Sequence, residues 1–230
     1  AVVVPPGDEV HYVERVVRMP ESYQANDARP AMPERGPTRA EAGLPAAGLV
    51  FCSFNSSYKI TPPVFAIWMR LLHAVEGSVL WLLEGNAAAP DNLRRAAGVH
   101  GIAPERLIFA PVVKHAEHLA RQRLADLFLD TLPVNAHTTA SDALSVGLPV
   151  VTCAGNAFAG RVAASVLRAA GLPELVASDL PQYEALALRL ATQPAELAAI
   201  RAKLLRDGDS CPLFDTDRFR RHLETAYVTM

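Results

Sequence analysis

The 230-residue sequence has few cysteines, few charges and no long apolar run. Cys52, Cys153 and Cys211 are odd in number and widely spaced, which indicates neither a disulfide framework nor a zinc site and fits a reducing cytoplasm. Only 20% of the residues are charged and 50% are hydrophobic, so the composition excludes a disordered chain. No apolar stretch approaches the roughly 20 residues of a membrane-spanning helix, so we expect no membrane partner.

An excess of charge of one sign is also missing. The 22 Lys and Arg residues and the 24 Asp and Glu residues give a formal net charge of −2. A protein that binds nucleic acid electrostatically is usually basic or has a basic stripe, so we expect no nucleic-acid partner. The first residues lack the charged and apolar regions of a signal peptide, and the chain opens at Ala1. We therefore expect a cytoplasmic protein with further sequence upstream.

Several nucleotide and catalytic motifs are absent as well. The sequence has no GxGxxG after its first expected strand, no P-loop pattern and no GxSxG, so an ordinary dinucleotide fold, a P-loop and a nucleophile elbow are not expected. Residues 207–209 and 215–217 have a DxD form, but both lie in late helical or loop sequence. We interpret them as solvated turns and predict no metal-dependent phosphate site there.

Proline is concentrated near the start of the chain. Nine of the 18 prolines lie in the first 63 residues, and residues 30–48 mix proline, glycine and charge without periodicity, which is typical of a linker or exposed loop. Residues 10–19 are apolar and β-branched, and we interpret them as a tail that packs on another unit. We therefore divide the chain into residues 1–48, the end of a preceding unit plus a linker, and residues 49–230, one domain.

From residue 49 onward, short apolar runs alternate with segments of helical spacing. The runs are continuously apolar rather than alternating, as in strands that are buried on both faces. This pattern predicts an α/β fold with a doubly wound parallel sheet and terminal helices. The expected strands are 49–54, 78–83, 106–110, 127–130, 150–153 and 174–177, and the expected helices are 62–75, 91–99, 114–123, 138–146, 158–170, about 181–206 and 216–227.

Ligands of an open parallel sheet bind at the carboxyl ends of its strands, so the loops that lead into helices are the candidate sites. The loop after the first strand carries Asn55, Ser56 and Lys59, which offer an amide, a hydroxyl and a cation for a phosphate. The alternative is a solvated loop lysine.

A second polar loop runs into the helix expected at 114–123. His118 and Arg121 are three residues apart and share one face of that helix, as do His115 and His118. Two histidines and Glu117 suggest a metal site, but their order differs from HExxH and no convincing third ligand is present, so we predict no metal. An ordinary polar helix face is the simpler alternative.

A third polar loop precedes the helix expected at 138–146. Thr138 or Thr139 is expected to cap this helix, whose free backbone N–H groups and dipole would attract an anion. His137 lies just before the turn and can donate to the same anion, and Asp142 lies one turn further, within reach of a ribose hydroxyl. A simple capping sequence beside a loop histidine remains the alternative.

Taken together, these segments resemble the C-terminal catalytic lobe of O-linked N-acetylglucosamine transferases, and the chain is similar to the bacterial-type members. The resemblance is dense from residue 49 to the end, and residues 11–27 look like the end of the preceding lobe. The motifs are FNSSYKI (54–60), SVLWLLE (78–84), RLIFAPV (106–112), LADLFLDTLPVNAHTTASDAL (124–144), GRVAASVLRAAGLPELVA (160–177) and SCPLFDTDRF (210–219).

The resemblance implies a GT-B glycosyltransferase, in which two Rossmann-like lobes hold UDP-N-acetylglucosamine between them, with tetratricopeptide repeats upstream. It assigns Lys59 to the diphosphate and makes it the catalytic candidate. It further assigns residues to uridine (Val113 by its backbone, His118, Arg121), to the pyrophosphate-binding turn (His137, Thr138, Thr139) and to the ribose (Asp142). Asn55 belongs to the same matching loop. Ser56 and His115 stand where animal members have a glutamine and a lysine.

The reaction that the resemblance implies is inverting transfer of N-acetylglucosamine to Ser or Thr hydroxyls of an acceptor protein or peptide, with no cofactor and no metal. The family's base-like histidine belongs to the upstream lobe. Two alternatives stay open. One is another GT-B enzyme that uses a UDP-sugar, either a transferase or an epimerase. The other is a non-catalytic, nucleotide-binding scaffold lobe.

Overall fold

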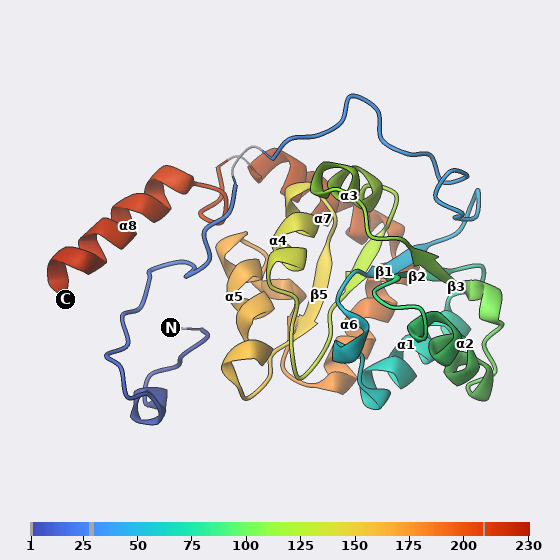
Figure 1. Cartoon of the computed structure of the whole chain (residues 1–230), viewed down its shortest axis with the longest axis horizontal. Helices are drawn as coiled ribbons and strands as arrows, with labels where there is room; N and C mark the ends of the chain where they lie inside the picture. The colour runs from blue at the N-terminus through green and yellow to red at the C-terminus, as the bar shows by residue number, and fades with distance from the viewer. Residues whose placement is uncertain (1, 28–29, 209) are drawn as a thin grey trace.

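The computed structural model describes residues 2–27, 30–208 and 210–230 (Figure 1). A six-stranded sheet lies at its centre in the order β3-β2-β1-β4-β5-β6, and every adjacent pair is parallel. The strands are β1 (Val50–Ser53), β2 (Val79–Leu83), β3 (Leu107–Ala110), β4 (Leu127–Leu129), β5 (Val150–Cys153) and β6 (Val176–Ala177). The expected doubly wound α/β fold is therefore confirmed.

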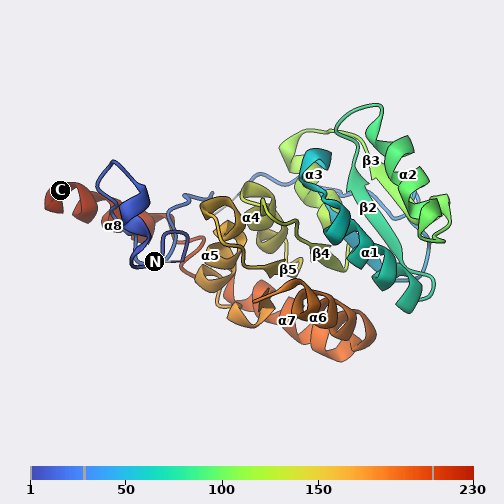
Figure 2. The same cartoon turned by 90° about the horizontal axis from the view of Figure 1, so that it is seen from below.

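Helices cover both faces of this sheet (Figures 1 and 2). They are α1 (Pro62–Ala74), α2 (Ala89–Val99), α3 (His115–Gln122), α4 (Thr138–Ser145), α5 (Val162–Ala169), α6 (Leu180–Thr192), α7 (Pro194–Asp207) and α8 (Thr216–Thr229). Helix α1 packs against α6, whereas α3, α4 and α5 contact one another in sequence. The strand order reverses between β1 and β4, so these two neighbouring strands lead into helices on opposite faces.

The core has the composition that parallel strands between two helix layers require. All four residues of β1 and all four of β5 are buried, because helices remove both sheet faces from water. Trp68, Trp81 and Tyr183 are the largest fully buried side chains. Helix α1 begins with two prolines, which suit a first turn because its N–H groups have no intrahelical acceptor, and it buries the expected face that contains Trp68.

Three expected elements differ from the structure. The single helix expected at about 181–206 is wrong: the chain forms α6 and α7, separated at Gln193, because Pro194 cannot donate an N–H to a continuing helix. The helix expected at 158–170 starts with a 3-10 turn, Phe158–Gly160, before α5. The strand expected at 174–177 keeps only Val176–Ala177, since a second 3-10 turn, Pro173–Leu175, precedes it.

The first part of the chain forms no strand within its described residues. It holds the 3-10 turn η1 (Asp8–His11) and packs on the domain through the Tyr23 and Phe158 rings, 5.3 Å apart, and through the Asp8–Arg161 ion pair. Val13 is fully exposed. The segment runs beside α8 at the end of the molecule that carries both termini (Figures 1 and 2). The boundary near residue 48 stays a prediction.

Helix α8 extends beyond the sheet domain and buries none of its side chains. Its described contacts to the first part of the chain include Arg218 and His222, both paired with Glu21. Among the described helices, none combines the length and apolar character needed to cross a membrane.

Candidate functional site

The loop after β1 and the turn before α4 lie against each other at the carboxyl ends of β1 and β4. Lys59 Nζ donates to the carbonyl oxygen of Asn135 at 2.9 Å, and the Thr139 hydroxyl donates to Asn55 Oδ1 at 3.0 Å. Lys59 ends the short 3-10 turn η2 (Ser57–Lys59), and Ser56 precedes that turn on the surface. The structure thus brings together two of the three loops that the sequence analysis selected.

Lys59 is a half-buried cation at this junction. Burial lowers the pKa of its ammonium group, while the charge of Asp130 opposes that change. The carbonyl oxygen of Asn135 fixes one of its three donors, which leaves the others to face an anion. A phosphate placed here would meet a point charge whose position is already set.

The amino end of α4 supplies further donors. The expected threonine cap is wrong: His137 occupies the N-cap position without a side-chain cap bond, and the Thr139 hydroxyl turns to Asn55 instead. The backbone N–H groups of Thr138 and Thr139 have no acceptor within the described residues. Unpaired N–H groups at a helix start attract anions because the helix dipole adds to them.

His137 adds one more polar atom to the same place. Its Nε2 is buried and has no hydrogen-bond partner among the described residues. Burial, followed by the charge of Lys59, lowers the pKa of the imidazole. Because a buried polar atom without a partner costs free energy, an unpaired ring nitrogen beside Lys59 fits a site that is completed by a ligand.

His118 and Arg121 contact each other on one face of α3, as their spacing predicts. His118 Nδ1 lies 3.0 Å from Arg121 Nε and 2.8 Å from Arg121 Nη2, and Arg121 Nη1 donates to the carbonyl oxygen of Pro111 at 2.6 Å. Both side chains pack on Phe54: the guanidinium lies 5.1 Å from the ring centroid, and the imidazole meets the ring edge. Since Nδ1 accepts from the guanidinium, the neutral imidazole carries its proton on Nε2.

Burial, together with Arg121 and His115, lowers the pKa of His118 to about 4. His118 is therefore a neutral ring at the pH of the cell. A neutral, half-buried imidazole against an aromatic ring is suited to stacking and hydrogen bonding rather than to pairing with a phosphate.

His115, at the start of α3, contacts Asp142 of α4. The Nε2 and Oδ1 atoms are 3.1 Å apart, so the structure pairs two residues that the sequence analysis treated separately. Burial raises the pKa of Asp142, and His115 opposes that effect. Both residues line a pocket of about 220 Å³ together with Thr138 and with Gln24 and Asn26 of the first part of the chain.

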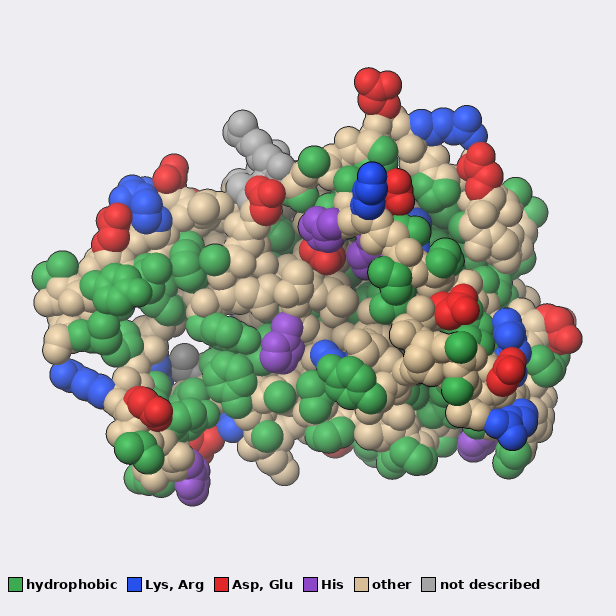
Figure 3. Space-filling model, viewed as in Figure 1, with side chains coloured by type: hydrophobic (Ala, Val, Ile, Leu, Met, Phe, Trp, Pro, Cys, Tyr) green, Lys and Arg blue, Asp and Glu red, His purple; other side chains and the backbone are tan. Residues whose placement is uncertain are grey.

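The two histidines of the suggested metal site contact different side chains: His115 contacts Asp142, and His118 contacts Arg121. Within the ranges that the structure describes, no three His, Cys, Asp or Glu side chains are grouped to hold a metal ion. In the space-filling view, histidine side chains lie near the middle of the face where α3 and α4 meet (Figure 3).

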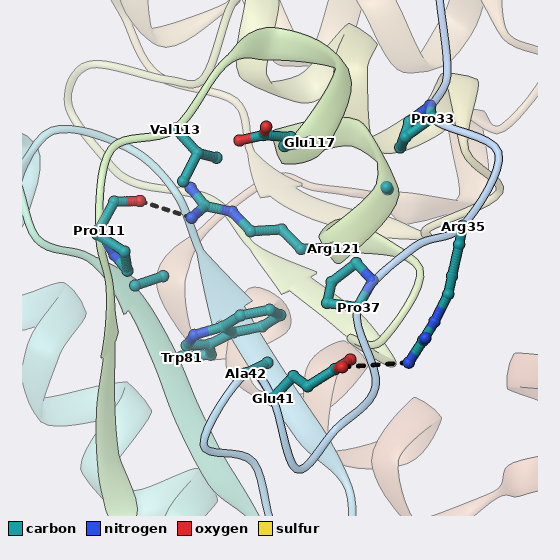
Figure 4. A pocket seen from close by; sticks show the side chains of 12 residues that line it. Pro33, Arg35, Pro37, Glu41, Ala42, Trp81, Pro111, Val113, Glu117 and Arg121 are labelled. Carbon is teal, nitrogen blue, oxygen red and sulfur yellow. Dashed lines mark hydrogen bonds and ion pairs between the residues drawn. The ribbon is translucent and has the colours of Figure 1, made fainter.

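A larger pocket, of about 430 Å³, lies beside Arg121 (Figure 4). Val113 and Arg121 line it together with Trp81, and the linker closes one side with Arg35 and Glu41, which form an ion pair at 3.1 Å. The composition of this linker predicts a linker or an exposed loop. Residues 30–48 carry no periodicity that would place them against the sheet, so their place in the pocket lining could not be predicted from the sequence.

Asp130 is a residue of this region that the sequence patterns do not select as a site residue. The sequence pattern predicts it only as the last residue of an apolar strand, yet its buried carboxylate accepts hydrogen bonds from Asn55 and from the backbone N–H of Ala136, which belong to the two loops described above. The signal that could have found it is a lone acid at the end of a buried strand, next to two polar loops.

Comparison with known proteins gives one consistent family. The model for glycosyl transferase family 41 matches residues 22–223. The chain is 40% identical over 187 residues to the UDP-N-acetylglucosamine--peptide N-acetylglucosaminyltransferase of Caenorhabditis elegans, a match that covers 81% of this chain and 16% of the relative. It is 36% identical over 225 residues to a protein of Arabidopsis thaliana, named "Probable UDP-N-acetylglucosamine--peptide N-acetylglucosaminyltransferase SEC", covering 95% of this chain and 23% of the relative.

Solved structures agree with this result. A mutant of the O-GlcNAc transferase of Thermobaculum terrenum superposes with a TM-score of 0.82 at 32% identity, covering 100% of this chain and 45% of that one. A sucrose-phosphate synthase of Thermosynechococcus elongatus, at 15% identity and a TM-score of 0.59, shares the fold alone. The chain thus spans less than a quarter of the two curated relatives and just under half of the solved O-GlcNAc transferase.

Proposed function

The chain belongs to glycosyl transferase family 41, and from this we propose that it is the nucleotide-binding C-terminal lobe of a GT-B enzyme that transfers N-acetylglucosamine from UDP-N-acetylglucosamine to Ser or Thr hydroxyls of proteins. In this proposal residues 49–230 form the lobe and residues 1–48 join it to an upstream catalytic lobe, which tetratricopeptide repeats precede. The partial coverage of longer relatives supports the existence of such upstream parts.

The observation that carries the proposal is the convergence of Lys59 with the amino end of α4. A lysine, two free backbone N–H groups and an unpaired imidazole nitrogen meet at the ends of β1 and β4. A diphosphate needs several donors and positive charge in one place. These groups provide both without a metal ion, and we propose that the donor diphosphate binds here.

The remaining site residues are proposed to hold the nucleoside. We propose that Asp142, with His115 beside it, binds the ribose, and that His118, Arg121 and the backbone of Val113 hold the uracil. The Asp142 carboxylate accepts hydrogen bonds, as ribose hydroxyls require, and the neutral His118 ring offers a flat face. Asn55 and Ser56 lie on the diphosphate side, with Asn55 already bound to Thr139.

In the proposed reaction the acceptor hydroxyl oxygen attacks the anomeric carbon of the sugar from the face opposite UDP. The new glycosidic bond forms as the bond from that carbon to the β-phosphate oxygen breaks, so the anomeric configuration is inverted. The hydroxyl proton goes to a base, a role that the proposal gives to the upstream lobe. Negative charge grows on the β-phosphate, and Lys59 and the N–H groups of α4 stabilise it.

Further parts of the proposal concern cofactor and location. We propose that the enzyme needs no cofactor and no metal, because Lys59 and the start of α4 supply the positive potential that a divalent cation would otherwise give. We also propose a cytoplasmic location, which the three free, buried cysteines support. The proposed partners are the UDP-sugar and an acceptor protein or peptide, without nucleic acid or membrane.

Mass spectrometry of products from the full-length protein tests the function. The protein is incubated with UDP-N-acetylglucosamine and a mixed pool of acceptor proteins, with and without EDTA. We expect N-acetylglucosamine on Ser or Thr side chains in both samples. An altered sugar formed without any acceptor would indicate an epimerase, and a protein that fails to bind UDP would indicate a scaffold.

The 230-residue chain by itself provides a second test. Since the base and the facing lobe are assigned to upstream sequence, we expect the isolated chain to bind UDP weakly and to transfer no sugar. Robust transfer by this chain would contradict the division of labour between two lobes.

A further inference from the structure

Asp130 follows β4 and is 2% exposed, yet it has no place in the proposed reaction. Its carboxylate accepts four hydrogen bonds. Oδ1 accepts from the backbone N–H groups of Thr131 and Ala136, at 2.7 and 2.6 Å, and from Asn55 Nδ2 at 3.2 Å. Oδ2 accepts from the hydroxyl of Thr152 on β5 at 2.6 Å. A buried carboxylate is tolerated only when its lone pairs are occupied in this way.

A single atom, Asp130 Oδ1, therefore joins the two loops of the candidate site. Asn55 belongs to the loop after β1, and its Oδ1 in turn holds the Thr139 hydroxyl. Ala136 belongs to the turn before α4, and its neighbour Asn135 provides the carbonyl oxygen that holds Lys59. Removing Oδ1 would take one hydrogen bond from each loop, while Asn55 Nδ2 would keep its bond to the Thr131 hydroxyl at 2.9 Å.

The other contacts of Asp130 point away from the site. Its backbone carbonyl accepts from the Tyr183 hydroxyl at 3.0 Å, and that hydroxyl accepts from Trp68 Nε1 at 3.0 Å. With Thr152, these residues tie the end of β4 to α6, α1 and β5. The core thus holds Asp130 through its backbone carbonyl and Oδ2, and Oδ1 contacts the two loops.

We propose that Asp130 is a positioning residue, which through Oδ1 sets the place of Lys59 relative to the first turn of α4 so that one diphosphate contacts both. This inference rests on the proposed function, because it takes the nucleoside diphosphate as the ligand. Donors on separate loops must be fixed before the ligand arrives, since a displacement of about 1 Å can cost on the order of 100-fold in rate.

Three variants of the chain separate positioning from general support. Asp130→Ala removes both oxygens. Asp130→Asn keeps an oxygen at Oδ1 for the same three donors, and its amide can donate to the Thr152 hydroxyl, so it is the conservative rescue. Thr152→Val is the matched control, because it removes one equally short bond to Asp130 but leaves Oδ1 and both loops untouched.

Each variant is measured in two ways, by calorimetric titration with UDP and by amide hydrogen exchange in peptides that cover residues 54–60 and 134–140. We expect Asp130→Ala to weaken UDP binding by at least about 10-fold and to speed exchange in both peptides. Asp130→Asn and Thr152→Val should stay within about 3-fold of the wild type in both measurements. If Asp130→Ala does not fold, Asp130→Glu replaces it, since the longer side chain keeps the charge and displaces the oxygens.

Two results would overturn the inference. One is a folded Asp130→Ala variant with unchanged UDP affinity and unchanged amide exchange. The other is an equal loss of UDP affinity in Thr152→Val, which would show that the affinity follows the stability of the fold. If the wild-type chain itself does not bind UDP, the proposed function fails, while the exchange comparison still decides whether Asp130 places the loops.

Discussion

Lys59 Nζ lies 2.9 Å from the carbonyl oxygen of Asn135, although the two residues are 76 positions apart in the sequence. This hydrogen bond joins the loop after β1 to the turn before α4. The cation is therefore held beside the free N–H groups of Thr138 and Thr139. The arrangement suits a group whose charge grows during a reaction, because the donors need no reorganisation.

The first prediction concerns Lys59→Ala in the full-length enzyme. Preorganised donors are individually worth about 10²–10³ in rate, so kcat for sugar transfer should fall by about that factor, and the UDP affinity should change less. Steady-state kinetics and calorimetry measure the two effects. Lys203→Ala is the control, since Lys203 pairs with Glu174 on the surface of α7. Transfer at the normal rate by Lys59→Ala would remove Lys59 from the mechanism.

The second prediction concerns Asp142, the residue proposed to bind the ribose. Asp142→Asn keeps the size of the side chain but exchanges one acceptor oxygen for a donor and removes the charge, so UDP should bind about 10-fold more weakly, a loss of about 1.4 kcal/mol. Asp217→Asn, on the exposed face of α8, should bind UDP as the wild type does. Equal affinities for all three proteins by calorimetry would exclude Asp142 from the ribose site.

The third prediction is that His118 stays neutral throughout the physiological range. Burial and Arg121 hold its pKa at about 4, below the usual 6.5, so this group favours folding above pH 6.5 and loses that contribution as the pH falls towards 4. An NMR titration of the imidazole should show no protonation between pH 5.5 and 8. In Arg121→Gln the pKa should rise only part of the way to 6.5, because burial is the larger cause. A midpoint near 6.5 in the wild type would contradict this description.

The fourth prediction concerns Asp130, whose pKa is raised, whereas that of His118 is lowered. Burial raises the pKa of this carboxyl from 3.8 to about 6 despite its four hydrogen bonds. The folded chain therefore binds the proton more tightly than the unfolded chain, and the resulting stability is present below pH 3.8 and lost as the pH rises through 6. Relative to Asp130→Asn, which does not titrate, the wild type should lose about 2 kcal/mol of unfolding free energy between pH 4 and 7.

Urea unfolding of the wild type and Asp130→Asn at several pH values measures this difference. Taking the difference cancels the titration of the other carboxylates and histidines. A difference that does not change with pH would mean that Asp130 has the same pKa in both states.

The positions of the strands were predictable because each is a short apolar run that is buried on both faces. Residues 150–153 are an example, since β5 has the expected bounds. The break between α6 and α7 was readable in principle from Pro194, but the apolar spacing continues across it. The capping of α4 was not readable, because both threonines are good caps and only the proximity of Asn55 explains why Thr139 turns away.

Features that depend on residues close together in the chain could be predicted: the parallel α/β alternation, the loops that carry polar side chains and the His118–Arg121 contact, which follows from helical geometry. Which of these loops meet could not be predicted in this way. The contacts of Lys59 with Asn135 and of Asp130 with both loops require β1 to lie beside β4, and the contact of His115 with Asp142 requires α3 to lie beside α4. That pairing is a property of the whole sheet, because it depends on the packing of distant strands and helices and on no local pattern.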